Sequence, residues 1–594
     1  MTTARVKMMG AVLLLLGAGC SSTGGAGGTG GTGQGTGTGG TTATGGSNGT
    51  GTGGSNGTGT GGSNGTGTGG SQSASGGVSG TGTGGSQSAS GGVSGTGIGG
   101  VGPSTGGTPG GGGGAGPGTG GTAPGTGGST PAPTTLVTSA SGAYWTTGTP
   151  TTVTTGNATV TIHDDQPQQT WTGFGGAFNE IGWNVLQMLS QADRDKAIHL
   201  LYGSDGARFN MGRIPIGASD YAIMRYTEDE TAGDTSLANF SISRDMMYLI
   251  PYIKAAQAVN PSIHFWASPW TPPTWMKTFS GSVNGATCAM QGTSAFDGGC
   301  MNASTANLTA YAQYFVKFVQ AYAGQSIAID YVAPQNEPNY ALGYPTCLWN
   351  STDYAKFVGQ YLGPALGSTS AKLMLGTSSN KDSGKDTTVI TTVMGDATAK
   401  TFPKVIGLQW GMLDNYEANS SMYKGYGIPV WATEHMCGNY PWNPSGSPKY
   451  VEPAPNDQAY GVESWGYIAK AIRGGVTAYN AWNMVLDTMG KGNDSTRQWA
   501  QDALLTVNTS SKTLNITPAY YAFRHFSQFA QPGAQVLSTT GGDSVGFKNP
   551  DGTLVGVMYN SGSATTYTVA IGGKKLQFAM PAQGWATILY NPAN

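Results

Sequence analysis

The first quarter of the chain cannot form a packed domain. No Asp, Glu, Lys or Arg occurs between Lys7 and Asp164, and no aromatic residue occurs before Tyr144. From Ser21 to about Thr134 the sequence is almost entirely Gly, Thr, Ser, Ala and Pro, in visible short repeats. Such a segment has too little apolar surface to offset the conformational entropy lost on folding. We therefore interpret residues 20–134 as a flexible linker and expect the ordered part of the chain after it.

The extreme N-terminus has the features of an export signal, which we predict to span residues 1–19. Two basic residues are followed by the apolar run Ala11–Leu16 and by three small residues before Cys20. Cys20 is similar to the acylated cysteine of bacterial lipoproteins. Gly17 stands where that signal usually has a larger apolar residue, so secretion without a lipid is the alternative. The apolar run is too short to span a bilayer, so we expect an extracellular or cell-surface protein that contacts the membrane only through a lipid anchor.

Composition excludes several classes of partner and cofactor. The net charge is −2 and residues of both signs are interspersed, so there is no electrostatic case for binding nucleic acid or an anionic membrane face. The five histidines show no ligand spacing, and no phosphate loop is present, so we predict neither a metal nor any other cofactor.

Four cysteines follow Cys20, namely Cys288, Cys300, Cys347 and Cys437. In an exported chain they allow three pairings, and the spacing alone does not choose among them. Our first choice is a bond between Cys288 and Cys300, which would close one short loop. For the other two cysteines, free buried thiols are nearly as good an interpretation.

Between residues 170 and 531 short apolar strands alternate with amphipathic helices. Strands are expected at residues 263–267, 327–333, 373–375, 405–408, 429–432 and 477–482, and helices near residues 190–203, 311–322, 354–362 and 462–472. This alternation indicates a parallel sheet covered on both faces. The number of units favours a closed (β/α)8 barrel, a TIM barrel of the α/β class, over an open sheet.

The two flanks of this region have a different pattern. Residues 532–594 contain short alternating strands separated by Gly and Asn, which is typical of an antiparallel sheet. Residues 135–169 are rich in Thr and Val and end in a strand pattern at residues 158–162. Because both segments flank the barrel, we expect them to form one small β-sandwich side domain together.

Two glutamates stand out because each comes just after a predicted strand. Glu337 follows Tyr331-Val-Ala-Pro-Gln-Asn, and Glu434 follows Pro429-Val-Trp-Ala-Thr. In a barrel, such positions face the mouth of the active site. Two carboxyl groups about 5 Å apart cleave a glycosidic bond with retention, one donating a proton and the other attacking the anomeric carbon. The alternative, that each carboxylate only holds a loop, is weakened by the matching contexts.

Several motifs, taken in order, resemble glycoside hydrolase family 30, which includes glucosylceramidases, endo-β-1,6-glucanases and some xylanases. They cover nearly the whole ordered region. The motifs are Trp171-Thr-Gly-Phe-Gly-Gly-Ala-Phe178, Arg213-Ile-Pro-Ile-Gly-Ala-Ser-Asp220, Ser268-Pro-Trp-Thr-Pro-Pro-Thr-Trp-Met-Lys277 and Tyr520-Tyr-Ala-Phe-Arg-His-Phe-Ser-Gln-Phe529.

The resemblance implies a role for each matched residue. Glu337 would be the acid/base and Glu434 the nucleophile, while Asn336 would hydrogen-bond the 2-hydroxyl of the substrate. Asp220, Trp270 and Trp482 match positions that line the glucose subsite in the family. Arg213 is expected to support a carboxylate rather than to touch sugar.

One motif departs from the family. The glucosylceramidase branch carries His-Trp-Tyr after its sixth strand, whereas this chain has Gln409-Trp410-Gly411 and so lacks the aromatic hydroxyl that normally touches the nucleophile. In contrast, Trp482-Asn-Met-Val-Leu-Asp487 resembles the glucosylceramidase and β-1,6-glucanase branches.

The leading functional hypothesis is therefore a retaining hydrolase of an extracellular β-glucan, with a β-1,6 linkage as the first choice. Glucosylceramidase-like or xylanase activity is the alternative within the same class. A carbohydrate-binding surface lipoprotein that has lost catalysis is the alternative from a different class. Each hypothesis makes a β-linked polysaccharide or glycoside the partner of the protein.

Overall fold

The computed structural model describes residues 134–379, 385–414, 416, 423–437, 453–495 and 500–593. The predicted signal, Cys20 and the linker lie outside these residues. Within the described part of the chain, no helix has the length and apolar character needed to cross a bilayer.

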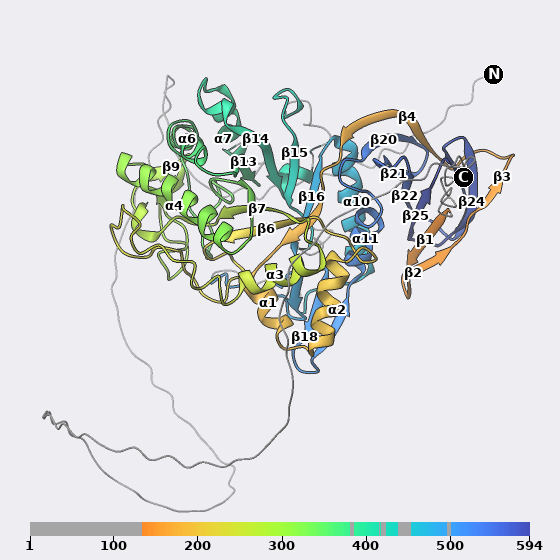
Figure 1. Ribbon diagram of the computed structural model, residues 1–594, viewed down its shortest axis with the longest axis horizontal. Helices are drawn as coiled ribbons and strands as arrows, with labels where there is room; N and C mark the ends of the chain where they lie inside the picture. Colours follow the sequence, from red (N-terminus) through yellow and green to blue (C-terminus); the bar gives the residue numbers. More distant parts are fainter. Residues whose placement is uncertain are drawn as a thin grey trace, which may run out of the picture. The chain divides into compact units, whose positions relative to one another are not determined.

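Eight parallel strands close into a barrel, which confirms the predicted fold (Figure 1). Each strand pairs with its neighbours in parallel register, and the last strand pairs with the first. In order around the barrel they are β5 (Gly173–Ala177), β6 (Met211–Ile216), β7 (His264–Pro269), β12 (Ile329–Val332), β13 (Lys372–Ser378), β14 (Pro403–Gln409), β15 (Val430–Glu434) and β16 (Ala478–Asn483).

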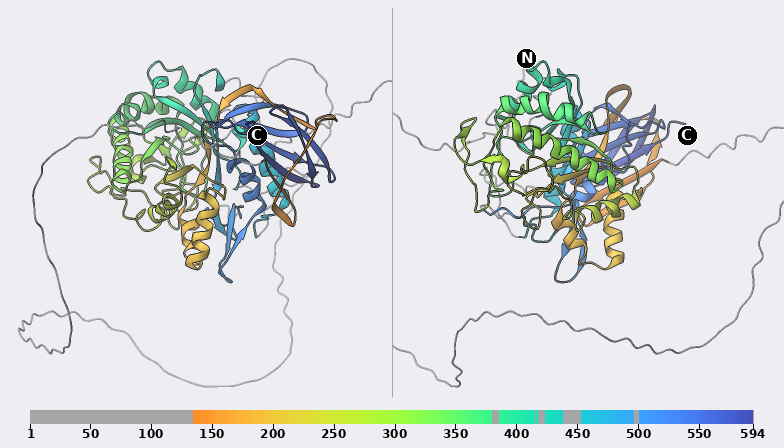
Figure 2. Two further views of the ribbon diagram at one scale, coloured as in Figure 1. Left: turned by 45° about the vertical axis from the view of Figure 1, so that its right-hand side comes forward. Right: turned by 60° about the vertical axis from the view of Figure 1, so that its left-hand side comes forward.

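Helices follow most of these strands and pack around them (Figures 1 and 2). The main ones are α1 (Glu180–Leu186), α2 (Gln191–Tyr202), α3 (Leu249–Val259), α4 (Thr305–Gly324), α5 (Ser351–Lys356), α6 (Gly363–Leu366), α7 (Lys385–Gly395), α8 (Gly411–Asp414), α10 (Gln458–Gly474) and α11 (Pro518–Ser527). Because helices cover the outside and side chains fill the inside, strands such as β15 and β16 are buried at every position.

Residues 354–362 depart from the single α-helix that we predicted there. Helix α5 ends at Lys356, and residues Phe357–Leu362 form a π-helical turn that leads into α6. A wider i to i+5 turn changes the face that each following side chain presents, so the simple 3.6-residue spacing does not describe this segment.

A ten-stranded sheet builds the side domain and mixes strands from both ends of the ordered region (Figure 2). Its N-terminal members are β1 (Thr135–Ala140), β2 (Ala143–Gly148), β3 (Thr151–Val153) and β4 (Val160–Thr170). Its C-terminal members are β20 (Gln535–Thr540), β21 (Asp543–Lys548), β22 (Leu554–Asn560), β23 (Thr565–Ile571), β24 (Lys574–Met580) and β25 (Gly584–Tyr590). Strand β1 pairs with β25, and β4 lies between β20 and β23, as expected for a domain built by both segments.

A buried histidine joins the barrel to the side domain. His525 on α11 lies with one ring nitrogen 2.8 Å from the hydroxyl of Thr587 and the other 2.8 Å from that of Ser139. Burial lowers the pKa of His525 to about 3, so the ring is neutral in this contact.

Candidate active site

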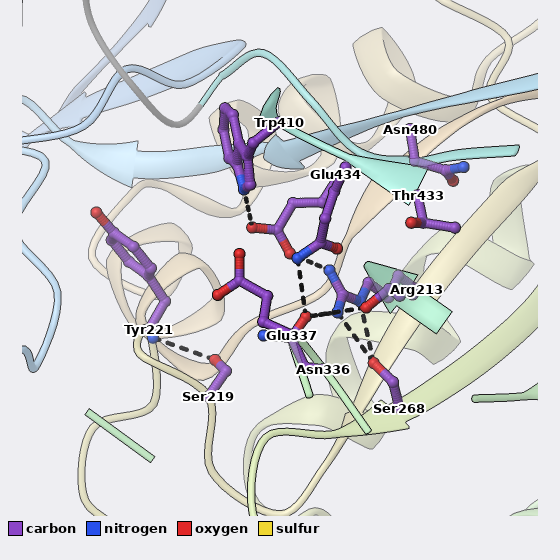
Figure 3. Close-up of polar contacts among 12 residues, drawn as sticks. Arg213, Ser219, Tyr221, Ser268, Asn336, Glu337, Trp410, Thr433, Glu434 and Asn480 are labelled. Atoms are coloured by element: carbon purple, nitrogen blue, oxygen red, sulfur yellow. Dashed lines mark hydrogen bonds and ion pairs between the residues drawn. The ribbon is translucent and has the colours of Figure 1, made fainter. Parts of the chain in front are cut away.

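The two predicted catalytic glutamates converge at the carboxyl-terminal end of the barrel. Glu434 is the last residue of β15, and Glu337 lies five residues beyond the end of β12. Both are only 5% exposed. Figure 3 shows their carboxyl groups turned toward a common space, and the negative charge of Glu337 acts on the titration of Glu434. Two carboxyl groups from separate strands therefore face one another, as glycosidic cleavage requires.

Glu337 is held by its backbone as well as by its side chain. Its N–H donates to the carbonyl oxygen of Thr377 at 3.0 Å, and its φ of 48° lies in the left-handed region that favours glycine. The hydroxyl of Tyr344 donates to its Oε2 at 3.1 Å. A strained conformation held by surrounding contacts is typical of a functional side chain.

Arg213 lies fully buried beside Glu434 and supports it, as the sequence predicted. Its Nη1 forms a salt bridge with Oε2 of Glu434, and its Nη2 donates to Asn336 at 2.6 Å. Its guanidinium carbon lies 4.2 Å from the ring centre of Trp270 and 5.5 Å from that of Trp482. A buried cation packed on aromatic faces stabilises the ionised form of Glu434.

Asn336 is oriented by three donors that share its side-chain oxygen. Arg213 donates to Oδ1 at 2.6 Å, Thr377 Oγ1 at 3.1 Å and Gln409 Nε2 at 3.2 Å. Since the oxygen already accepts three hydrogen bonds, it is the amide NH2 group that remains for another partner. This orientation suits the predicted role of Asn336 as a donor to the 2-hydroxyl of a sugar.

Asp220 is a third acid of the same site and is half-buried. It lies in the loop after β6, and its Oδ1 has no hydrogen-bond partner among the described residues. Burial raises the pKa of Asp220 well above its ordinary value, and the charges of Glu434 and Glu337 add to this rise. An unpartnered buried carboxyl oxygen close to both catalytic acids suits the predicted contact with sugar hydroxyls.

Trp270 and Trp482 are buried more deeply than tryptophans that stack against a sugar at the rim of a site. Their rings stack with centres 5.4 Å apart, and they are 1% and 2% exposed. Both also pack against Arg213. Their position fixes the Arg213 guanidinium directly, and their predicted contact with a sugar ring stays a prediction.

Arg225 connects four loops around the mouth of the barrel. Its Nε donates to Asp297 at 2.7 Å, and its Nη2 donates to the carbonyl oxygens of Gly343 and Asn493 at 2.9 Å. The backbone N–H of Asn493 in turn donates to the carbonyl oxygen of Asp220 at 2.7 Å. Gly343 directly precedes Tyr344, whose hydroxyl donates to Glu337. We call Arg225 and its three partners the Arg225 clamp.

We expect Arg225→Met to lower both stability and catalytic efficiency. The change leaves Asp297, which is fully buried, without its cation, and breaking such a pair costs about 3 kcal/mol. Urea unfolding and the kcat/KM of an aryl β-glucoside measure the two effects. In Arg225→Met/Asp297→Asn stability should recover in part, while kcat/KM should stay low because the loops remain untied. Equal recovery of both quantities would contradict a role of the clamp in catalysis.

The Cys288–Cys300 disulfide is present as predicted, in the loop after β7. Cys347 and Cys437 are free and buried, which agrees with the second interpretation of these residues. The described residues contain no group of three or more metal-binding side chains.

Comparison with known families shows to which family the chain belongs. The family description of the glycosyl hydrolase family 30 TIM-barrel domain matches residues 171–530, and that of the family 30 beta sandwich domain matches residues 533–588. The chain belongs to glycosyl hydrolase family 30. It is therefore an O-glycosyl hydrolase by family, with the barrel and the side domain typical of that family.

Relatives of the chain include glucosylceramidases and endo-1,6-beta-glucanases. Putative glucosylceramidase 4 of Caenorhabditis elegans is 28% identical over 442 residues, which cover 71% of this chain and 80% of that protein. An endo-1,6-beta-D-glucanase of Neurospora crassa is 28% identical over 440 residues, covering 70% and 83%. A solved endo-beta1,6-glucanase structure covers 77% of this chain and 99% of its own, with 23% identity and a TM-score of 0.66, and has the same fold.

The departure from the family 30 motif changes the hydrogen-bond donors around Glu434 but does not remove them all. Gln409 donates to Asn336, and the indole N–H of Trp410 donates to Oε1 of Glu434 at 2.8 Å. The motif indicated that the aromatic hydroxyl of the glucosylceramidase branch is absent here, but it did not reveal the hydrogen bond that Trp410 donates to Glu434. The contacts of Tyr344 and Arg225 were also missed, although Tyr344 follows Glu337 by only seven residues.

We expect the kcat/KM of this family 30 enzyme to rise with pH as Glu434 loses its proton. Burial raises the pKa of Glu434 to about 7, although Arg213 and the N–H of Trp410 favour the carboxylate. Only the carboxylate is a nucleophile, so activity should fall as the pH drops below about 7. A pH profile of kcat/KM measured on an aryl β-glucoside tests this, and a rate that does not change between acidic and neutral pH would contradict it.

Proposed function

We propose that the protein is a retaining β-glucoside hydrolase that acts on a β-1,6-linked glucan by double displacement. The observation that carries this proposal is the pairing of Glu337 with Glu434 across one space, with Glu434 held by two cationic or N–H donors (Figure 3). An acid that is held among donors suits the nucleophile. The side chain of the opposite acid, Glu337, accepts the hydroxyl of Tyr344 and no other donor within the described part of the chain, which suits the proton donor.

The residues support a two-step reaction. In the first step Glu434 attacks the anomeric carbon, the glycosidic bond breaks, and the leaving oxygen takes a proton from Glu337. In the second step water gives a proton to Glu337 and attacks the same carbon, which releases Glu434. Asn336 donates to the 2-hydroxyl, and Asp220 accepts from sugar hydroxyls farther from the reacting bond.

The choice of a β-1,6-glucan rests on relatives whose names include endo-1,6-beta-D-glucanase and on the segment Trp482–Asp487. A glucosylceramide is the second candidate, since other relatives at similar identity are glucosylceramidases. A xylan is the third candidate and is supported only by fold. A chain that binds β-glucan without cleaving it is the remaining alternative.

Product analysis separates these candidates. The purified protein is incubated with pustulan, glucosylceramide and xylan, and Glu434→Gln serves as the inactive control. We expect release of β-configured oligosaccharides from pustulan, which proton NMR of the fresh product detects at the anomeric position. Faster cleavage of glucosylceramide or xylan would replace the proposed substrate, and an α-configured first product would exclude double displacement.

We also propose that the enzyme is exported and held at the bacterial surface by a lipid on Cys20. The basic start, the apolar run and the small residues before Cys20 support this, and the linker of residues 20–134 would let the barrel move away from the membrane. Cells fed a clickable fatty acid should label the full-length protein but not Cys20→Ser. Equal labelling of both would refute the lipid anchor.

A further inference from the structure

Trp410 is held rigidly at the edge of the barrel beside the nucleophile. It directly follows β14, and its φ of 42° lies in the left-handed region. Its backbone N–H donates to the carbonyl oxygen of Glu434 at 3.2 Å, and its carbonyl oxygen accepts from Leu413 at 2.7 Å. Its ring packs edge-on against His435, with ring centres 5.7 Å apart. These contacts fix the direction in which the indole N–H points.

The indole N–H of Trp410 points at Oε1 of Glu434, which accepts it at 2.8 Å, whereas Oε2 of Glu434 is bound by Arg213 (Figure 3). An indole N–H can only donate and does not titrate in water. The carboxylate of Glu434 is therefore held by two groups that favour its charged form under all conditions. Arg213 is fully buried, whereas Trp410 is partly exposed, so Oε1 is the oxygen on the open side.

We propose that Trp410 is a positioning residue that acts mainly in the second half of the reaction, when the sugar leaves Glu434. This inference rests on the proposed double displacement. In the first step Oε1 bonds to the anomeric carbon, the glycosidic bond breaks and Glu337 protonates the leaving oxygen. Oε1 becomes an ester oxygen without charge, so the hydrogen bond from Trp410 weakens.

The second step reverses this change. Water attacks the anomeric carbon, its proton goes to Glu337, and the bond to Oε1 breaks with its electron pair returning to Oε1. Negative charge then grows on the atom that Trp410 contacts, so the indole N–H stabilises the transition state more than the ester. The same donor gives no advantage in the first step, in which that charge disappears.

The test compares Trp410→Phe with a matched control. Trp465 on α10 is buried, and its indole N–H has no partner among the described residues, so Trp465→Phe removes the same atoms without a hydrogen bond. Both variants and the wild type are assayed with 2,4-dinitrophenyl β-glucoside, whose leaving group makes release of the sugar from Glu434 the slow step. Thermal unfolding checks that each variant is folded.

We expect kcat of Trp410→Phe to fall about 10- to 100-fold, which is the size expected for one hydrogen bond to a developing charge. KM should fall by a similar factor because the glycosyl-enzyme accumulates, and kcat/KM should stay close to that of the wild type. A merely structural role would instead lower kcat/KM. Equal losses in kcat and kcat/KM, or values equal to those of Trp465→Phe, would overturn the proposal.

A second measurement, by NMR, follows the wild-type protein itself and uses a variant only to assign one resonance. Indole-labelled wild-type protein is trapped with a 2-deoxy-2-fluoro-β-glucosyl fluoride, and Trp410→Phe identifies the Trp410 N–H resonance. We expect that resonance to move upfield on trapping, because Oε1 loses its charge, and an unmoved resonance would overturn the proposal. If the wild type shows neither a product burst nor trapping, double displacement itself is wrong and the inference falls with it.

Discussion

Replacing Glu434 with alanine is expected to lower kcat roughly 10⁴- to 10⁶-fold, the range seen when a covalent nucleophile is removed. Added azide should restore part of the activity. It can enter the space that the carboxylate leaves and attack the anomeric carbon from the same side, which gives an α-glucosyl azide. The rate with an activated aryl β-glucoside and the configuration of the azide product measure the two effects.

Two controls make this result specific. Glu463→Ala removes a glutamate of helix α10, which is not a strand of the barrel, and should leave kcat unchanged. Glu434→Gln keeps the size of the side chain beside Arg213 and should be as inactive as the alanine variant, without rescue by azide. A β-configured azide product, or an active Glu434→Gln variant, would remove Glu434 from the role of nucleophile.

Replacing Glu337 with glutamine should have an effect that depends on the leaving group. A sugar alkoxide leaves poorly without a proton, so hydrolysis of a β-glucan should slow by about 10³- to 10⁴-fold. A dinitrophenolate needs no proton to leave, so the first step with that substrate should change little. The ratio of the two kcat/KM values is the measurement, because kcat/KM reports the first step alone, whereas Glu337 also takes the proton of water in the second step.

Tyr344→Phe provides the matched control for the acid/base. It removes the hydroxyl that donates to Oε2 of Glu337 but keeps the carboxyl group itself. Its losses should be much smaller than those of Glu337→Gln, and similar for both leaving groups. Equal sensitivity of Glu337→Gln to the two substrates would show that Glu337 does not donate the proton.

Local sequence signals predicted several elements closely. Helix α2 begins after Ser190, whose hydroxyl accepts the N–H of Asp193 at 3.1 Å, and ends before Gly203, as its capping pattern indicated. Strands such as β14 and β15 were found because they contain the continuous apolar runs 405–408 and 429–432. Glu434 followed from the same logic, since it ends one of these strands.

Features that depend on tertiary context were harder to predict. Strand β6 contains the fully buried Arg213 and a proline, so its pattern does not look like a buried strand, and only the family resemblance marked it. The donor role of Trp410 depends on a left-handed backbone and on the neighbouring strand, which no spacing reveals. Likewise, the Arg225 clamp joins groups that are up to 268 residues apart.

The interleaving of the side domain imposes an order on biosynthesis. Gln535 on β20 bonds to Thr170 on β4 across 365 residues of chain, and β1, which pairs with β2 on one side, finds its second partner only in β25. A ribosome therefore produces the N-terminal strands long before their partners exist. Until the last strand emerges, these strands present unpaired edges of the kind that recruit other chains. Growth conditions that slow translation should consequently favour aggregation of this protein more than of a barrel whose side domain is encoded in one piece.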